Sequence, residues 1–248
     1  MVNEKNNPTE QDMYLAAGIH MGLKFKTKFL KEFIFKVRPD GLAIFDVQKI
    51  IDRIKVAGKF LSNYEPEDIL VVCRRDNGHR AVKAFCKVTG AKCFAGRYLP
   101  GLMTNTLYDD FYEPKVLVIC DPWPDKNAIS DALKLNIPIV GLVDTNNTTN
   151  NIDLLVPCNN KGRKSLGMIF YALAREYLIN RGLIKEGQEM EIPSFKFYKQ
   201  SETSRDDEEP EKETKSRSKP KPQKGKAKSK KSKPRADPKK SRLKKDRR

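Results

Sequence analysis

Hydrophobic positions in the first 200 residues alternate between unbroken runs and helical spacing. Unbroken apolar runs occur at 69–73 and 116–120, which predicts strands that are covered on both faces, and a further strand is predicted over 139–143. Between them, apolar residues recur every three or four positions over 77–89 and 127–135, which predicts helices. This alternation indicates βαβ units and an α/β fold with a mostly parallel sheet and helices on both faces.

Shorter sequence patterns predict further elements toward both ends of the first 200 residues, the body of the chain. Apolar segments at 33–37 and 42–45 flank Pro39-Asp40-Gly41, a turn sequence, and together they predict a small N-terminal β-hairpin. The remaining predicted elements are helices over 12–21, 47–61 and 162–180, with stop signals at Gly22 and Gly182, and short strands over 92–95 and 152–156.

The apolar pattern disappears after residue 200. The only hydrophobic residues beyond that point are Ala227, Ala236 and Leu243. Such a segment cannot bury enough apolar surface to offset the entropy lost on ordering its backbone. We therefore expect an α/β domain over residues 1–200 and a disordered tail over 201–248.

Charge is concentrated in the same tail. The chain has a formal net charge of +17, and residues 214–248 hold 18 basic and 2 acidic groups after an acidic run in 201–213. A flexible arm of this length spans roughly 30–35 Å on average. It could reach on the order of 115 Å when fully extended. Such a cationic arm predicts contact with phosphate backbones.

The body carries its own basic clusters. Lysines alternate with aromatic residues at 24–31, and other cations follow predicted strands or flank the start of the last helix, where a helix N-terminus favours anions. No aromatic-rich strand typical of single-strand RNA binders is present, which favours a large, shaped RNA. The candidate RNA-binding residues are Lys24, Lys26, Lys28, Lys31, Arg38, Arg74, Arg75, Arg97, Tyr98, Asn105, Lys161, Arg163 and Lys164.

Enzymatic signatures are weak. The loop after 69–73 contains one glycine, which excludes a dinucleotide fingerprint or a phosphate loop there. Asp121, Asp125 and Asp144 follow predicted strands and could hold Mg²⁺ in a phosphotransfer site. Short acceptor side chains at such positions more often cap helices or brace turns. No nucleophile arrangement is recognisable.

Metal and membrane classes are also disfavoured. Five cysteines without a Cys-x-x-Cys pair, and only two histidines, predict no zinc site and reduced, buried thiols. The longest apolar stretch, 137–143, is interrupted by proline and glycine, so we expect neither a membrane span nor a signal peptide.

Several motifs, in this order and spacing, carry a family resemblance over most of residues 12–182. They are Ala16-Ala17-Gly18-Ile19-His20-Met21-Gly22; Asp46-Val47-Gln48-Lys49; the loop 97–105 ending in Thr104-Asn105; Glu113-Pro114 and, after a strand, Asp121-Pro122; Leu135-Asn136-Ile137-Pro138; Gly141-Leu142-Val143-Asp144-Thr145-Asn146; and Pro157 with Asn159-Asn160 before Ser165. The sequence resembles the universal small-subunit ribosomal protein two family, which includes the laminin-receptor precursor. Pro100-Gly101 and the absence of a long helical insertion resemble archaeal or eukaryotic members.

The resemblance implies a three-layer, flavodoxin-like domain near the head–body junction of the small ribosomal subunit in the cytoplasm. It implies a structural role in translation, with contacts to small-subunit ribosomal RNA and neighbouring ribosomal proteins. It implies no catalysis, no cofactor, no small-molecule substrate and no membrane partner. Asp131 stands where the family usually has glutamate, and Thr106 where archaeal relatives often have proline. The tail lies outside the resemblance.

Two alternatives remain open from the residues alone. One is a Mg²⁺-dependent phosphotransfer or nucleotide-binding protein of the same fold, motivated by the three aspartates. The other is a non-specific nucleic-acid condenser driven by the tail.

Overall fold

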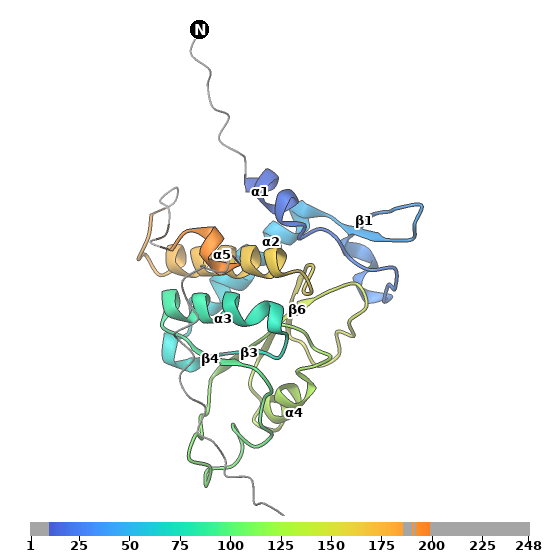
Figure 1. Ribbon diagram of the computed structural model, residues 1–248. Coiled ribbons are helices and arrows are strands. Elements are labelled where there is room, and N and C mark those ends of the chain that lie inside the picture. Colours follow the sequence, from blue (N-terminus) through green and yellow to red (C-terminus); the bar gives the residue numbers. More distant parts are fainter. Residues whose placement is uncertain (1–9, 186–189, 191, 199–248) are drawn as a thin grey trace, which may run out of the picture. The chain divides into compact units, whose positions relative to one another are not determined.

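A five-stranded parallel sheet forms the centre of the structure, a computed structural model that describes residues 10–185, 190 and 192–198 (Figure 1). Its strand order is β4-β3-β5-β6-β7, the order of flavodoxin-like doubly wound sheets. The strands are β3 (Ile69–Cys73), β4 (Lys92–Ala95), β5 (Val116–Ile119), β6 (Ile139–Val143) and β7 (Leu154–Pro157). The predicted parallel α/β fold is confirmed.

Helices cover both faces of this sheet and make three layers (Figure 1). One face carries α2 (Val47–Leu61), α3 (Asp76–Thr89) and α5 (Arg163–Asn180), and α5 packs against both α2 and α3. The opposite face carries α4 (Lys126–Lys134) together with the loop after β4. These four predicted helices are therefore present, with boundaries within one residue of the expected ones.

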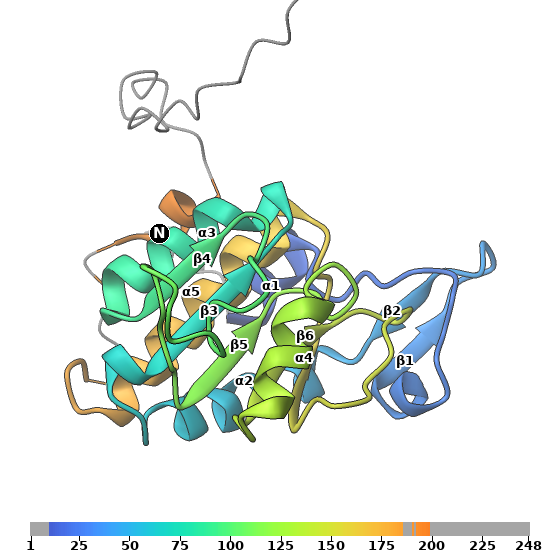
Figure 2. The same cartoon turned by 90° about the horizontal axis from the view of Figure 1, so that it is seen from below.

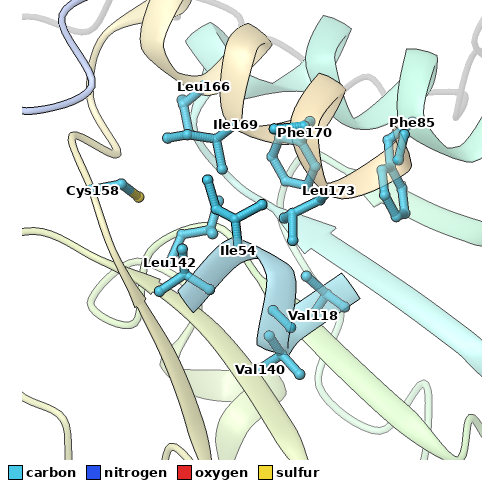
Figure 3. Packing of buried hydrophobic residues seen from close by; sticks show 14 of the residues in the cluster. Ile54, Phe85, Val118, Val140, Leu142, Cys158, Leu166, Ile169, Phe170 and Leu173 are labelled. Carbon is cyan, nitrogen blue, oxygen red and sulfur yellow. The ribbon is translucent and has the colours of Figure 1, made fainter. Parts of the chain in front are cut away.

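Alternate residues of β3 and β5 supply two hydrophobic cores, one on each face of the sheet. Val71 of β3 belongs to the core beneath α2, α3 and α5, whereas its neighbour Val72 belongs to the core beneath α4. This follows from the strand geometry, because successive side chains point to opposite faces. In the larger core, Phe85 of α3 and Phe170 of α5 meet edge to face, with ring centroids 5.7 Å apart (Figure 3).

An antiparallel hairpin lies to one side of the central sheet (Figure 2). It consists of β1 (Ile34–Val37) and β2 (Ala43–Phe45), joined by the predicted turn, in which the Arg38 N–H donates to the Leu42 carbonyl over 2.8 Å. The hairpin prediction is confirmed.

The first helix, α1 (Glu10–Ala17), is shorter than the predicted 12–21 helix. Gly18 adopts a φ of 72°, and the Ile19 N–H bonds back to the Tyr14 carbonyl over 3.3 Å. This left-handed glycine cap ends the helix four residues before the expected stop.

Three short 3-10 helices were not predicted: η1 (Phe29–Phe33), η2 (Pro66–Asp68) and η3 (Ser194–Phe197). The strand predicted over 152–156 begins two residues later, at Leu154. Across the described ranges, no helix combines the length and apolar character needed to cross a bilayer. The predicted disordered tail, 201–248, lies outside the described residues.

Candidate nucleic-acid interface

Loops that follow the parallel strands gather several predicted cations at the carboxyl edge of the sheet. Arg74 and Arg75 follow β3, Arg97 lies two residues beyond β4, and Lys161 lies in the loop after β7. The Asn77 amide at the start of α3 donates to the Lys161 carbonyl over 2.9 Å and joins two of these loops. Because ligands of open α/β sheets bind outside the carboxyl ends of the strands, this edge is the natural candidate surface.

A buried carboxylate, Asp121, fixes the loop after β5. Its Oδ1 accepts hydrogen bonds from the Trp123 N–H at 3.1 Å and from the Asn147 amide at 2.8 Å. Its Oδ2 accepts from Arg75 Nε at 2.6 Å and forms an ion pair with that guanidinium. Arg75 therefore stabilises the carboxyl edge of the sheet through its ion pair with Asp121, and part of its side chain remains exposed to solvent.

A second buried carboxylate, Asp144, holds the loop after β6 in the same way. Its Oδ2 accepts from Lys161 Nζ at 3.0 Å, and that ammonium also donates to the Asn146 side chain at 2.9 Å. The Asn147 side chain accepts from the Asp144 N–H at 2.7 Å. Since Asn147 also donates to Asp121, one continuous network ties the two strand ends together.

Two interpretations of the aspartates after the strands were open, a Mg²⁺ site and the bracing of turns, and these contacts favour the second. Asp121 and Asp144 each bind a cationic side chain and brace a turn, as the simpler interpretation predicts. Asp125 precedes α4 and accepts from the Arg74 N–H at 3.1 Å, and burial raises the pKa of its carboxyl to about 7. In the part of the chain that the structure describes, no group of three or more His, Cys, Asp or Glu side chains could hold a metal ion.

The lysine-rich loop that begins at Lys24 is anchored to the same edge. The Leu23 N–H donates to Thr145 Oγ1 at 2.8 Å, and the Thr27 N–H donates to the Thr145 carbonyl at 2.9 Å. Because Thr145 follows β6 directly, these bonds place the loop beside the Asp144 network. Lys24 and Lys28 are exposed there.

Other predicted residues are exposed at separate positions. Arg163 and Lys164 open α5, whose N-terminal N–H groups favour an anion. Lys31 lies in η1, close to the hairpin in sequence, and Arg38 lies in the hairpin turn. Asn105 is exposed in the loop before β5, and its side-chain oxygen accepts from the Leu107 N–H at 3.1 Å.

Tyr98 is the one predicted residue whose side chain is buried, with 3% of its surface exposed. Its hydroxyl donates to Asp131 Oδ2 at 3.2 Å, and the same oxygen accepts from the Gly101 N–H at 2.8 Å. Burial alone would raise the pKa of Asp131, but hydrogen bonds from Gly101, Lys134 and Tyr98 outweigh it and lower that pKa. The ring therefore braces the loop after β4 and is not presented to a base.

Trp123 and Lys126 were not among the predicted residues. They line an open hollow of about 480 Å³ together with Arg74, Arg75, Pro124 and Asn127. Trp123 keeps 72% of its surface exposed, the only tryptophan of the chain. The available sequence signal was a tryptophan between two prolines, shortly after the predicted strand over 116–120.

Comparison with known proteins identifies the family. A family model described as Ribosomal protein S2 matches residues 14–109 and 107–179. A protein named small ribosomal subunit protein uS2 from Methanococcus maripaludis is 48% identical over 185 residues, 75% of this chain and 84% of that protein. The protein of the same name from Nanoarchaeum equitans is 47% identical over 186 residues, 75% of this chain and 92% of its own. Another, from Pyrobaculum aerophilum, is 44% identical over 188 residues, again 75% of this chain and 90% of that protein.

The matched regions include the carboxyl-edge network and the loops that carry its cations. The resemblance to archaeal members, inferred from motifs, is thereby confirmed, and the phosphotransfer alternative loses its basis. The chain belongs to the ribosomal protein S2 family, whose members are structural proteins rather than enzymes.

Proposed function

We propose that this protein is a structural constituent of the small ribosomal subunit in the cytoplasm, where it binds small-subunit ribosomal RNA and neighbouring ribosomal proteins and so supports translation. The observation that carries this proposal is the 48% identity to a protein named small ribosomal subunit protein uS2 across most of the described body. The basic carboxyl edge supplies a physical means of holding RNA.

The RNA contacts proposed here come from exposed side chains, except for that of Lys26, which is half-buried. Phosphate contacts need cations that are free to approach the backbone, and they position an RNA without reading its sequence. Arg75 and Lys161 already bind buried carboxylates, so they add to the local positive potential and mainly hold the loops. Tyr98 is left out because its ring is buried. The proposed contact residues are Lys24, Lys26, Lys28, Lys31, Arg38, Arg74, Arg97, Asn105, Arg163 and Lys164.

Contacts to neighbouring proteins are proposed for the N-terminal hairpin and the loop before it. Phe25, Phe29 and Phe35 are all exposed there. Exposed aromatic side chains gathered on one part of a surface are typical of protein–protein interfaces. The hairpin also lies to one side of the sheet, where it is free to reach a neighbour (Figure 2).

Sedimentation of a cell lysate at moderate salt tests the proposed function. The protein is expected in the fractions that contain the small subunit. Its presence only in the light fractions would contradict the proposal.

A salt titration of RNA binding tests the individual contacts. If Arg97 touches a phosphate, Arg97→Ala should weaken binding modestly and flatten the salt dependence by about one unit of slope. The matched control is Lys55→Ala, which removes an exposed cation from α2, on a helix that covers the sheet face. An unchanged slope for Arg97→Ala would assign Arg97 to the solvated surface.

A further inference from the structure

The hollow beside Trp123 lies at the topological switch point of the sheet. The chain leaves β3 toward α3 on one face, and it leaves the neighbouring strand β5 toward α4 on the opposite face. Two connections that diverge in this way leave a crevice between them, and doubly wound sheets use it for ligands. Arg74 lines it from the β3 side, and Trp123 and Lys126 line it from the β5 side.

The tryptophan in this hollow is held in place but left uncovered. Its N–H is bonded to Asp121, and the prolines before and after it restrict the backbone on both sides. An aromatic ring of this size stabilises a fold chiefly by burying its faces, and Trp123 leaves most of its surface in water. Because the backbone at Trp123 is held, a flat partner that stacks on the exposed ring needs to order only the side chain.

The cations of the hollow divide into two kinds. Arg75 is bound to Asp121, so its charge is largely compensated. Arg74 and Lys126 are exposed, and within the described residues neither forms a salt bridge. Lys126 is also the first residue of α4, where the helix N-terminus adds to the positive potential. The hollow thus presents an aromatic face beside two available positive charges.

We propose that this hollow binds one unstacked nucleotide of a single-stranded RNA segment, with its base against Trp123 and its phosphate between Arg74 and Lys126. The inference rests on the proposed role in RNA binding and specifies one contact within it. Stacking on an aromatic ring beside cations is a recurrent, sequence-tolerant way of holding single-stranded RNA.

The geometry disfavours two other occupants. A free dinucleotide needs a glycine-rich turn that lets the backbone approach the diphosphate, and the only glycine near the β3 turn, Gly78, is used for packing: a Cβ there would lie 2.5 Å from Cys73 Sγ. An acidic peptide would satisfy the two cations and leave the ring uncovered. A nucleotide within an RNA strand satisfies both the ring and the cations.

Fluorescence of the full chain tests this inference, because Trp123 is its only tryptophan. Single-stranded r(A)6 is expected to quench the emission saturably. An r(A)·r(U) duplex, whose bases are already stacked, is expected to bind the protein without quenching. The double variant Arg74→Ala, Lys126→Ala should reduce the salt slope of r(A)6 quenching by about 0.7, the single-strand value for one phosphate contact, and each single variant should reduce it by part of that amount.

A matched control moves the reporter tryptophan to another exposed site. Trp123→Phe combined with Leu183→Trp places the sole tryptophan at an exposed site just beyond the C-terminal end of α5, the end opposite Arg163 and Lys164, where r(A)6 should leave the emission unchanged. Equal quenching at both sites would overturn the inference, and so would an emission change with hexaglutamate but not with r(A)6. If the chain sediments with the small subunit while r(A)6 leaves Trp123 unquenched, the hollow is not a nucleotide site and the proposed function stands. Failure to sediment with the subunit would instead remove the proposed function.

Discussion

Removal of the buried carboxylate at position 121 should be far more costly than removal of an exposed one. Asp121→Ala leaves three donors without their acceptor: the Arg75 guanidinium, the Asn147 amide and the Trp123 N–H. The Asp121 side chain is 1% exposed, whereas that of Arg75 is 31% exposed. Breaking a buried ion pair by deleting one partner typically costs about 3–5 kcal/mol.

Water that reaches Arg75 should recover part of this loss, so we expect a value of about 3 kcal/mol, toward the lower end of that range. This is a large share of the roughly 5–15 kcal/mol by which a folded domain is stable. Loss of the network should therefore shift the unfolding midpoint clearly without abolishing the fold.

The matched control is Asp68→Ala. Asp68 pairs with Lys115 over 2.8 Å, but the two side chains are 24% and 70% exposed. Exposed pairs contribute about 0–1 kcal/mol, because water solvates both partners after the pair is broken. Both variants remove one aspartate from one ion pair, so the difference between them reports the burial of the Asp121 pair together with the two further hydrogen bonds that Asp121 accepts.

Equilibrium unfolding in urea measures both effects. Asp121→Ala should lower the free energy of unfolding by at least about 2 kcal/mol more than Asp68→Ala does, with similar dependence on urea. Equal losses in the two variants would refute the reasoning that the Asp121 network holds the carboxyl edge together.

Three further predictions concern single contacts. Asp125→Asn should become more stable than the wild type as the pH rises from 4 to 8, because the raised pKa of about 7 makes ionisation of Asp125 costly in the folded state. The gain in the free energy of unfolding is at most about 4 kcal/mol, and a difference between the two proteins that stays constant with pH would contradict this reasoning. Gly78→Ala places a methyl group against Cys73 and should cost about 1–3 kcal/mol, seen as a lower Tm; an unchanged Tm would show that the core yields there. Tyr98→Phe removes the hydrogen bond to Asp131, so urea unfolding should show a free energy of unfolding lower by about 1 kcal/mol, with the affinity for RNA unchanged. Weaker RNA binding without any loss of stability would instead place Tyr98 in the RNA interface.

The central strands were predictable because their burial on both faces leaves a mainly apolar signature. The runs at Ile69–Cys73 and Ile139–Val143 match the observed strands residue for residue. The distribution of helices was not predictable in the same way. That α2, α3 and α5 share one face while α4 covers the other depends on the direction of each crossover, which local periodicity does not record.

The residue types that form the site were predictable from the sequence, but which of these residues contact one another was not. Arg75 and Asp121 are 46 positions apart, and Tyr98 and Asp131 are 33 apart, so their contacts arise only when the sheet brings strand ends and loops together. Sequence therefore indicates a basic edge without showing which cation is bound to a carboxylate. It also gives no measure of how exposed Trp123 remains.

We expect the folded body, rather than the basic tail, to hold this protein in the small subunit. Deletion of residues 201–248, followed by sedimentation of the truncated chain, tests this expectation most directly. Residues 1–200 should still sediment with the small subunit at moderate salt. Recovery of the truncated chain only in the light fractions, with the isolated tail binding RNA as well as the whole chain does, would contradict it.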